Sequence, residues 1–266
     1  MEYDFGDRPT ARDVAVRLAI LGYVVTHAMA APPEDARAGL LHGRSESEVA
    51  DIKSAFMAAA DKFWGPVRAG PLWRCLTPWE QEFAGQGFDM DPQDQINGIW
   101  RAQALDVLLW ALGITDAINA YDVEASPDVL KLIPADLLSR DPVRLQLRPA
   151  TPLERERNVA ELWHWRSRTR QLQVEGYPFQ GNRDLDKMGI RGYPDLIRQT
   201  AEMARDNGDI PRVIDGDFPA FGKPYRALTP EEWSIVTSIT IERHFALNWL
   251  CGYAPGNRWD ETPTDT

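Results

Sequence analysis

Apolar residues recur at every third or fourth position along most of this sequence, and no segment shows the strict alternation of a half-buried strand. The repeat is clearest in residues 11–25, 45–64 and 94–113, where the apolar side chains would share one helix face, and Gly113 is suited to end the last helix. Length alone allows one domain or two. Because no stretch has the composition of a linker, we expect an all-α fold, mainly α-helical, with a single compact multi-helix domain over residues 1–266.

Residue spacing places several helix starts. Ser45 and Glu48 have the spacing of a capping box, in which each side chain bonds the backbone amide of the other residue. The phrase Thr-Pro-x-Glu begins at Thr77, Thr151 and Thr229, and it predicts three more caps with proline in the first helical turn. Because their flanking sequences differ, we interpret them as independent helix starts and not as an internal duplication.

Two regions depart from the helical pattern. Residues 174–228 are rich in Gly, Pro and aromatic residues around one short helical stretch at 195–207, and they predict a loop-rich insertion. Such an insertion either wraps the core or covers a pocket. Residues 252–266 form an acidic C-terminal tail with too much Gly and Pro for a helix. This tail either docks on the core or frays, and we expect docking because Trp259 favours burial.

The formal net charge of −11 limits the partners of this chain. An acidic surface repels nucleic acid and anionic lipid, so we expect neither nucleic-acid nor membrane binding. The charge suits a basic protein partner, although it would equally serve solubility alone.

Cysteine usage and the apolar segments bear on location. Cys75 and Cys251 are the only cysteines, which fits a reducing cytoplasm better than a disulfide. Residues 1–13 do not resemble a signal peptide. We identify residues 104–114 as the longest apolar run, too short to span a bilayer, and therefore expect a soluble cytoplasmic protein.

Familiar catalytic and metal motifs are missing from the sequence. It contains no phosphate-binding glycine loop, no G-x-S-x-G and no H-E-x-x-H. With four histidines and two cysteines we expect no metal site and no cofactor. Residues 89–94, DMDPQD, alternate carboxylates somewhat as a calcium loop does. They directly precede a helix, which favours a helix N-terminus with Asp94 as its cap.

The segment ELWHWRSRTR, residues 161–170, interleaves tryptophans with Arg166, Arg168 and Arg170. Such a pattern can stack on single-stranded nucleic acid. Because the whole chain is acidic, we favour a helix with aromatic residues on one side and solvated arginines on the other. His164 is then expected at the edge of the core.

Glu242, Arg243 and His244 are the candidate catalytic residues, in a helix expected from Thr229 to about Cys251. Glutamate and histidine can carry protons, and burial would raise the pKa of Glu242 toward neutrality. Adjacent helical residues point about 100° apart, so the three cannot form one contiguous site. Arg243 lies on the most apolar stripe and is expected to be buried and paired, whereas His244 is expected to reach solvent or the tail.

Candidate binding residues follow from the need to pair buried charges. Arg243 is expected to pair with Asp106 or with Asp260 of the tail, and Glu242 with Arg101. The remaining candidates belong to the tail: Trp259 as its anchor, and Asp265 as an acid that would meet Arg243 and His244.

Four segments together resemble an uncharacterised bacterial family, domain of unknown function 4272. They are WRAQALDVLLWALG (100–113), LTPWE (76–80), ERHFALNWL (242–250) and WDETPTDT (259–266). The resemblance implies an α-helical protein whose polar signature lies in the last helix and tail. It implies no activity, because none is established for the family.

Two classes of function remain open. The charge, the aromatic content and the missing catalytic motifs favour a protein-binding or regulatory module that recognises a basic partner. The alternative is an enzyme, a hydrolase or group transferase, with Glu242 or His244 as general base and Arg243 as an anion clamp. A purely structural role is a third possibility.

Overall fold

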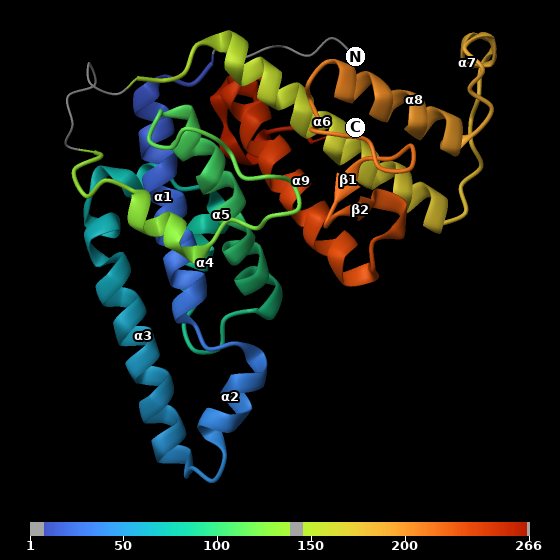
Figure 1. Cartoon of the computed structure of the whole chain (residues 1–266). Helices are drawn as coiled ribbons and strands as arrows, with labels where there is room; N and C mark the ends of the chain where they lie inside the picture. The colour runs from blue at the N-terminus through green and yellow to red at the C-terminus, as the bar shows by residue number, and fades with distance from the viewer. Residues whose placement is uncertain (1–7, 139–145, 265–266) are drawn as a thin grey trace. The chain divides into compact units, whose positions relative to one another are not determined.

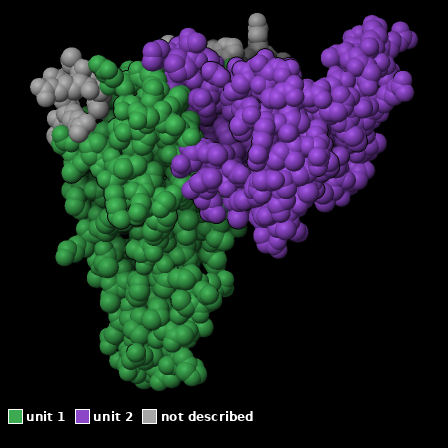
Figure 2. Space-filling view, viewed as in Figure 1, with its two compact units in different colours: residues 1–118, 125–148, 252–262 green, residues 119–124, 149–251, 263–266 purple. Residues whose placement is uncertain are grey.

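The computed structural model describes residues 8–138 and 146–264, and these are mainly helical (Figure 1). The all-α class is therefore confirmed. The chain divides into two compact units, coloured separately in Figure 2. Unit 1 comprises residues 1–118, 125–148 and 252–262, and unit 2 comprises residues 119–124, 149–251 and 263–266. The expectation of one domain over 1–266 stays a prediction.

Unit 1 is built on a pair of long helices, α1 and α5, which pack along each other. Its helices are α1 (Ala11–Ala30), α2 (Glu34–Leu41), α3 (Glu46–Ala69), α4 (Pro78–Phe83) and α5 (Pro92–Ala111). Short 3-10 turns complete it: η1 (Pro71–Cys75), η2 (Pro127–Leu132), η5 (Pro255–Asn257) and η6 (Trp259–Glu261). Gly98 of α5 permits the close approach, because a Cβ there would lie 2.8 Å from the Cβ of Ala28 in α1.

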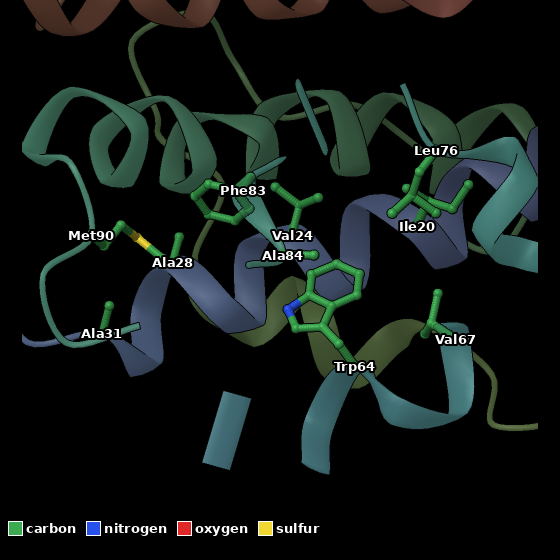
Figure 3. Packing of buried hydrophobic residues seen from close by; sticks show 10 residues of the cluster. All are labelled: Ile20, Val24, Ala28, Ala31, Trp64, Val67, Leu76, Phe83, Ala84 and Met90. Atoms are coloured by element: carbon green, nitrogen blue, oxygen red, sulfur yellow. The ribbon is translucent and has the colours of Figure 1, made fainter. Parts of the chain in front are cut away.

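The core of unit 1 gathers around Trp64, whose side chain projects from α3 toward α1 (Figure 3). The α1 stripe supplies Ile20, Val24 and Ala28, spaced as the sequence periodicity requires. The N-terminal part of α3 has no such cover. Ala60 is its first buried residue, and α2 has none. These two helices therefore present much of their surface to solvent.

A buried ion pair joins α1 to α4 in unit 1. The Arg17 guanidinium donates to both carboxylate oxygens of Glu80, at 2.7 and 2.9 Å, and to the Cys75 carbonyl at 3.0 Å. The Trp259 ring lies 5.0 Å from the same guanidinium and is buried. Within unit 1 the tail residue Trp259 is thus docked, as the sequence predicts.

Unit 2 is built on α6 (Ala150–Val174) packed along α9 (Pro230–Leu250). The predicted insertion lies between them and contains α7 (Arg183–Lys187), α8 (Tyr193–Asp206), β1 (Pro219–Ala220), β2 (Lys223–Pro224) and η4 (Tyr225–Ala227). The short helix is confirmed at α8. The antiparallel β1–β2 hairpin is not foreseen by the sequence analysis.

The tight turn and the short strands explain why the hairpin cannot be recognised from a strand pattern in the sequence. Phe221 and Gly222 both have positive φ, 50° and 73°, which is the backbone of a tight type I′ hairpin turn. Each strand has two residues and one of them is proline, so neither can show alternation.

Most of the expected helix caps are present. Ser45, Thr77 and Thr229 each form a capping box with the glutamate three residues later. Gly113 has φ +67°, as expected beyond the end of α5. Thr151 is a wrong prediction, because α6 begins at Ala150 with Pro149 as its N-cap and Thr151 lies inside the first turn.

The predicted cap at Asp94 is also wrong. Asp91 caps α5, its carboxylate accepting from the Gln93 and Asp94 amides. The Asp94 carboxylate accepts instead from the indole of Trp79 and the side-chain amide of Gln86. Both Asp91 and Asp94 are acidic residues near the start of α5, and the two possible caps lie only three residues, about one helical turn, apart.

By length and composition, α1 is more like a membrane-spanning helix than the segment 104–114 is. In the described part of the chain, α1 is the one helix that is long and apolar enough to cross a membrane by length and composition. Of its most apolar window, 56% is buried inside the fold, as in the core helices of many proteins.

The cap assignments can be tested by substitution. Thr229→Ala removes the bond from the Glu232 amide to the Thr229 hydroxyl and should lower the free energy of unfolding by about 1 kcal/mol. Thr151→Ala is the matched control and should change it by less than about 0.5 kcal/mol. Urea denaturation followed by circular dichroism measures both. Equal losses would contradict the assignment of Ala150 as the first residue of α6.

Candidate functional site

The three candidate catalytic residues lie in α9, as predicted, but in different environments. Arg243 and His244 are fully buried, and Glu242 is half-buried. The C-terminal half of helix α9 is largely enclosed, because Leu247, Trp249 and Leu250 are buried as well.

Arg243 is buried as predicted, and within unit 2 it binds backbone carbonyls. Its Nη1 donates to the carbonyls of Asn119 and Ala120, at 2.5 and 3.0 Å, and its Nη2 to that of Val123 at 3.0 Å. The guanidinium also stands 5.3 Å from the ring of Tyr121. Arg243 therefore holds the turn 119–123 against α9.

Tyr121 continues this contact into the core of unit 2. Its ring stacks on Trp163 of α6 with centroids 5.2 Å apart and planes 11° apart. Burial raises the pKa of the Tyr121 hydroxyl, although the charge of Arg243 opposes the shift. The turn is thus clamped between a cation and an aromatic ring.

His244 was expected to reach solvent or the tail, and it does not reach solvent. Its side chain is fully buried, and its Nδ1 lies 3.0 Å from the Nδ1 of His164 in α6. Burial, aided by the charges of His164 and then Arg157, lowers the pKa of His244 to about 3. A neutral imidazole with so low a proton affinity is a poor general base near pH 7. His164 is half-buried, which confirms its place at the edge of the core.

The candidate binding residues are divided between the units. Arg101 is half-buried on α5, 5.9 Å from the ring of Trp79, and Asp106 is buried on the same helix. Asp260 is exposed. These residues belong to unit 1, whereas Glu242 and Arg243 belong to unit 2, so the expected pairs of Arg243 with Asp106 or Asp260 and of Glu242 with Arg101 stay predictions. Asp265 lies outside the described residues.

A buried ion pair of unit 2 is not evident from the sequence. Arg166 was expected to be solvated, but it is fully buried and donates Nε and Nη2 to the two carboxylate oxygens of Asp217, at 2.7 and 2.9 Å. The same carboxylate accepts the backbone amides of Phe218 and Arg226, at 2.8 and 2.9 Å. The pair fixes the hairpin segment to α6. The one sequence signal that could have indicated the pair is that Asp217 directly precedes the apolar run F-P-A-F.

Unit 1 contains three hollows along α3, and neighbouring hollows share wall residues. The first, of about 450 Å³, lies between α1 and the segment 130–138, with Tyr23 and Phe63 in its wall. The second, of about 200 Å³, shares Thr26 and Phe63 with the first. The third, of about 320 Å³, shares Gly87 with the second. We refer to the three hollows together as the α3 groove.

Apolar residues line most of the α3 groove. Its middle hollow is walled by Phe56, Ala59 and Phe63 of α3 and by Ala30 of α1. His27 also stands in that wall, and its Nε2 donates to the Gln86 carbonyl at 3.0 Å, which holds the loop 86–91 in place. Burial lowers the pKa of His27 and keeps the ring uncharged near neutral pH.

The far end of the α3 groove is charged. Asp89 and Asp91 stand in the wall of the third hollow and are exposed, and Lys53 of α3 lies 2.8 Å from the Asp89 carboxylate. Exposed surface ion pairs of this kind are weak and exchange easily with other partners. Within residues 8–138 and 146–264, no three His, Cys, Asp or Glu side chains are placed to hold a metal ion.

Removal of the Arg243 guanidinium should destabilise the fold. Arg243→Leu leaves three carbonyls of the turn without their donor, and we expect the free energy of unfolding to fall by about 2–4 kcal/mol. Chemical denaturation measures the loss. A stability equal to that of the unchanged protein would contradict the structural role of this residue.

Unfolding should also become easier in acid because of His244. Its folded-state pKa lies below the unfolded value of about 6.5, so between about pH 6.5 and pH 3 the unfolded chain binds a proton that the folded chain does not. The stability contributed by neutral His244 is complete above pH 6.5 and is lost as the pH falls through this window. Between pH 7 and pH 4.5 the loss should be about 2 kcal/mol.

The variant His244→Gln should reduce this acid sensitivity, and His42→Gln, at an exposed position, should leave it unchanged. Denaturation curves at a series of pH values measure the slope of stability against pH for each. His27 contributes a slope of the same sign and remains in all three proteins. Identical slopes for the two variants would exclude the assignment to His244.

A family model described as domain of unknown function (DUF4272) matches residues 5–188, more than half of the chain. The match includes the segments 76–80 and 100–113 and ends before 242–250 and 259–266. Comparisons with curated proteins and with solved structures found no significant match.

Proposed function

This chain belongs to the family described as domain of unknown function 4272, and we propose that it is a protein-binding module whose α3 groove receives a basic, amphipathic segment of a partner protein. The observation that carries the proposal is the groove itself, with an apolar middle and an acidic end.

The shape and chemistry of the α3 groove suit a helix or extended segment more than a small molecule. Adjoining hollows give an elongated site, and aromatic side chains in its wall accept the apolar face of an amphipathic segment. Phe56 and Phe63 would contribute most of the binding energy, because buried aromatic contacts dominate such interfaces. The exposed apolar residues Met57 and Leu40 on α3 and α2 extend the surface available to a partner.

Charge selects the partner. The net charge of −11 and the exposed carboxylates of Asp89 and Asp91 favour a basic segment and disfavour nucleic acid and anionic membranes. Electrostatic attraction of this kind raises the association rate and weakens as salt is added. We also propose that the protein works in the cytoplasm, a location that suits Cys75 and Cys251 because neither is part of a disulfide.

The proposal can be tested with two neighbouring alanines of α3. Both Ala58 and Ala59 are exposed, but Ala59 stands in the wall of the groove and Ala58 does not stand in the walls of its three hollows. Ala59→Arg fills the middle hollow and adds a charge that repels a basic partner. Ala58→Arg adds the same charge outside it.

Capture from a lysate of the native host at low ionic strength should recover a basic protein with the unchanged chain and with Ala58→Arg. The variant Ala59→Arg should bind the purified partner at least about tenfold more weakly. Affinity should fall further when the ionic strength rises from about 0.05 to 0.3 M. Equal affinity for the two variants would refute the assignment of the groove as the binding site.

A further inference from the structure

Unit 2 also contains a hollow, of about 390 Å³, beside the buried Arg166–Asp217 pair. Its wall includes three arginines and three aspartates: Arg166, Arg198, Arg226, Asp195, Asp215 and Asp217. The hollow lies between α6, the first turns of α8 and the segment 215–226. Its volume is in the range of small-molecule sites, and its charged wall is unlike the apolar α3 groove of unit 1. We refer to it as the arginine pocket.

The carboxylate of Asp217 has no spare capacity for a ligand. It accepts four hydrogen bonds, two from the Arg166 side chain and two from backbone amides. Asp195 accepts the Arg191 amide at 3.1 Å and lies 3.8 Å from the Arg198 guanidinium. Two of the three wall aspartates are therefore already engaged, Asp217 fully and Asp195 in part.

The arginines, by contrast, keep unused donors. The Nη1 of Arg166 is buried and has no hydrogen-bond partner within residues 8–138 and 146–264. A buried charged donor without an acceptor is costly, so a polar ligand at this point would stabilise the fold. Arg198 approaches Asp195 and Glu202 at 3.8 and 3.6 Å, which is longer than a good hydrogen bond.

Arg226 also stands in the pocket wall and is half-exposed. Its Nη1 donates to the Asp215 carbonyl at 2.9 Å, and the rest of its planar fork stays available for an oxyanion. The backbone supports this arrangement, because Asp215 and Gly216 have φ of 48° and 75° and form a tight turn that carries the carbonyl. A non-glycine residue at φ 48° is uncommon and points to a turn held by its surroundings.

The N-terminus of α8 adds an electrostatic field that favours an anion in the pocket. Pro194, Asp195 and Ile197 of its first turns stand in the pocket wall, and the N-cap Gly192 supplies no side-chain cap. The amides at a helix N-terminus carry partial positive charge, which favours an anion nearby.

We propose that the arginine pocket binds a small molecule through an anionic oxygen group, a carboxylate or a phosphate, held by Arg166, Arg198 and Arg226. Arg166 stands in the pocket wall as its innermost cation, and the two half-exposed arginines would close around the oxygens of the anion. Charge-assisted bonds from guanidinium groups are the usual means of holding both kinds of group. The site is independent of the α3 groove, which lies in the other unit and has the opposite chemistry.

Inorganic phosphate and acetate serve as probes. Each is titrated into nitrogen-15-labelled protein at pH 7 against sodium chloride at constant ionic strength. At least one should give saturable shifts of the Gly216, Asp217 and Ile197 amides that chloride does not give. The anion with the higher affinity identifies the chemical class of the natural ligand. Shifts that do not saturate, or that chloride reproduces, would overturn the proposal.

Arginine variants locate the site, and Arg166 is left in place because its loss would also break the buried pair. The double variant Arg198→Gln, Arg226→Gln should bind the preferred anion at least about tenfold more weakly. Arg205→Gln is the matched control, since Arg205 also lies on α8 with 47% side-chain exposure against 46% for Arg198, and its affinity should change by less than about twofold. Equal binding by the double variant, or an equal loss in Arg205→Gln, would contradict the assignment. Circular dichroism checks that each variant is folded.

Discussion

Three arginines on the core helices carry buried guanidinium groups, and a buried cation without acceptors destabilises a fold by several kcal/mol. Arg17 of α1 bonds Glu80 and the Cys75 carbonyl, and Arg166 of α6 bonds Asp217. Arg243 of α9 bonds the carbonyls of residues 119–123. Each acceptor group lies at the edge of a helix or in an irregular segment. The helical core therefore fixes its connecting segments through charge-assisted hydrogen bonds as well as through apolar packing.

The helical class and most helix boundaries followed from the sequence, because periodicity and capping act locally. Ser45, Thr77 and Thr229 cap helices through residues three positions away, so a short window contains the whole signal. Thr151 failed because the proline two residues earlier already starts the helix. Arg243 was identified as buried from its apolar neighbours, but its carbonyl acceptors could not be found, since any residue type supplies a carbonyl.

Other features depend on contacts that no short window contains. Arg166 pairs with a residue 51 positions later, and its neighbours in the sequence include arginines that are more exposed.

Two candidate sites result from this fold, one mainly apolar and one with a charged wall. The α3 groove exists because the N-terminal part of α3 extends beyond the core, and the arginine pocket exists because a hairpin and α8 close around one buried arginine. The matched family region includes all of the groove wall but reaches only part of the pocket wall.

The contacts of Arg243 and Trp259 bear on how the chain folds during synthesis. The turn 119–123 is made early, yet the guanidinium that holds it belongs to α9, about 120 residues later. Unit 1 likewise receives Trp259 against Arg17 of its first helix. Because the chain is synthesised from its N-terminus, neither unit can finish folding early. Unit 2 needs α9 and unit 1 needs Trp259 of the tail. Contacts this distant in sequence slow folding. The apolar faces of the early helices stay exposed, and prone to aggregation, until α9 and the tail have been synthesised.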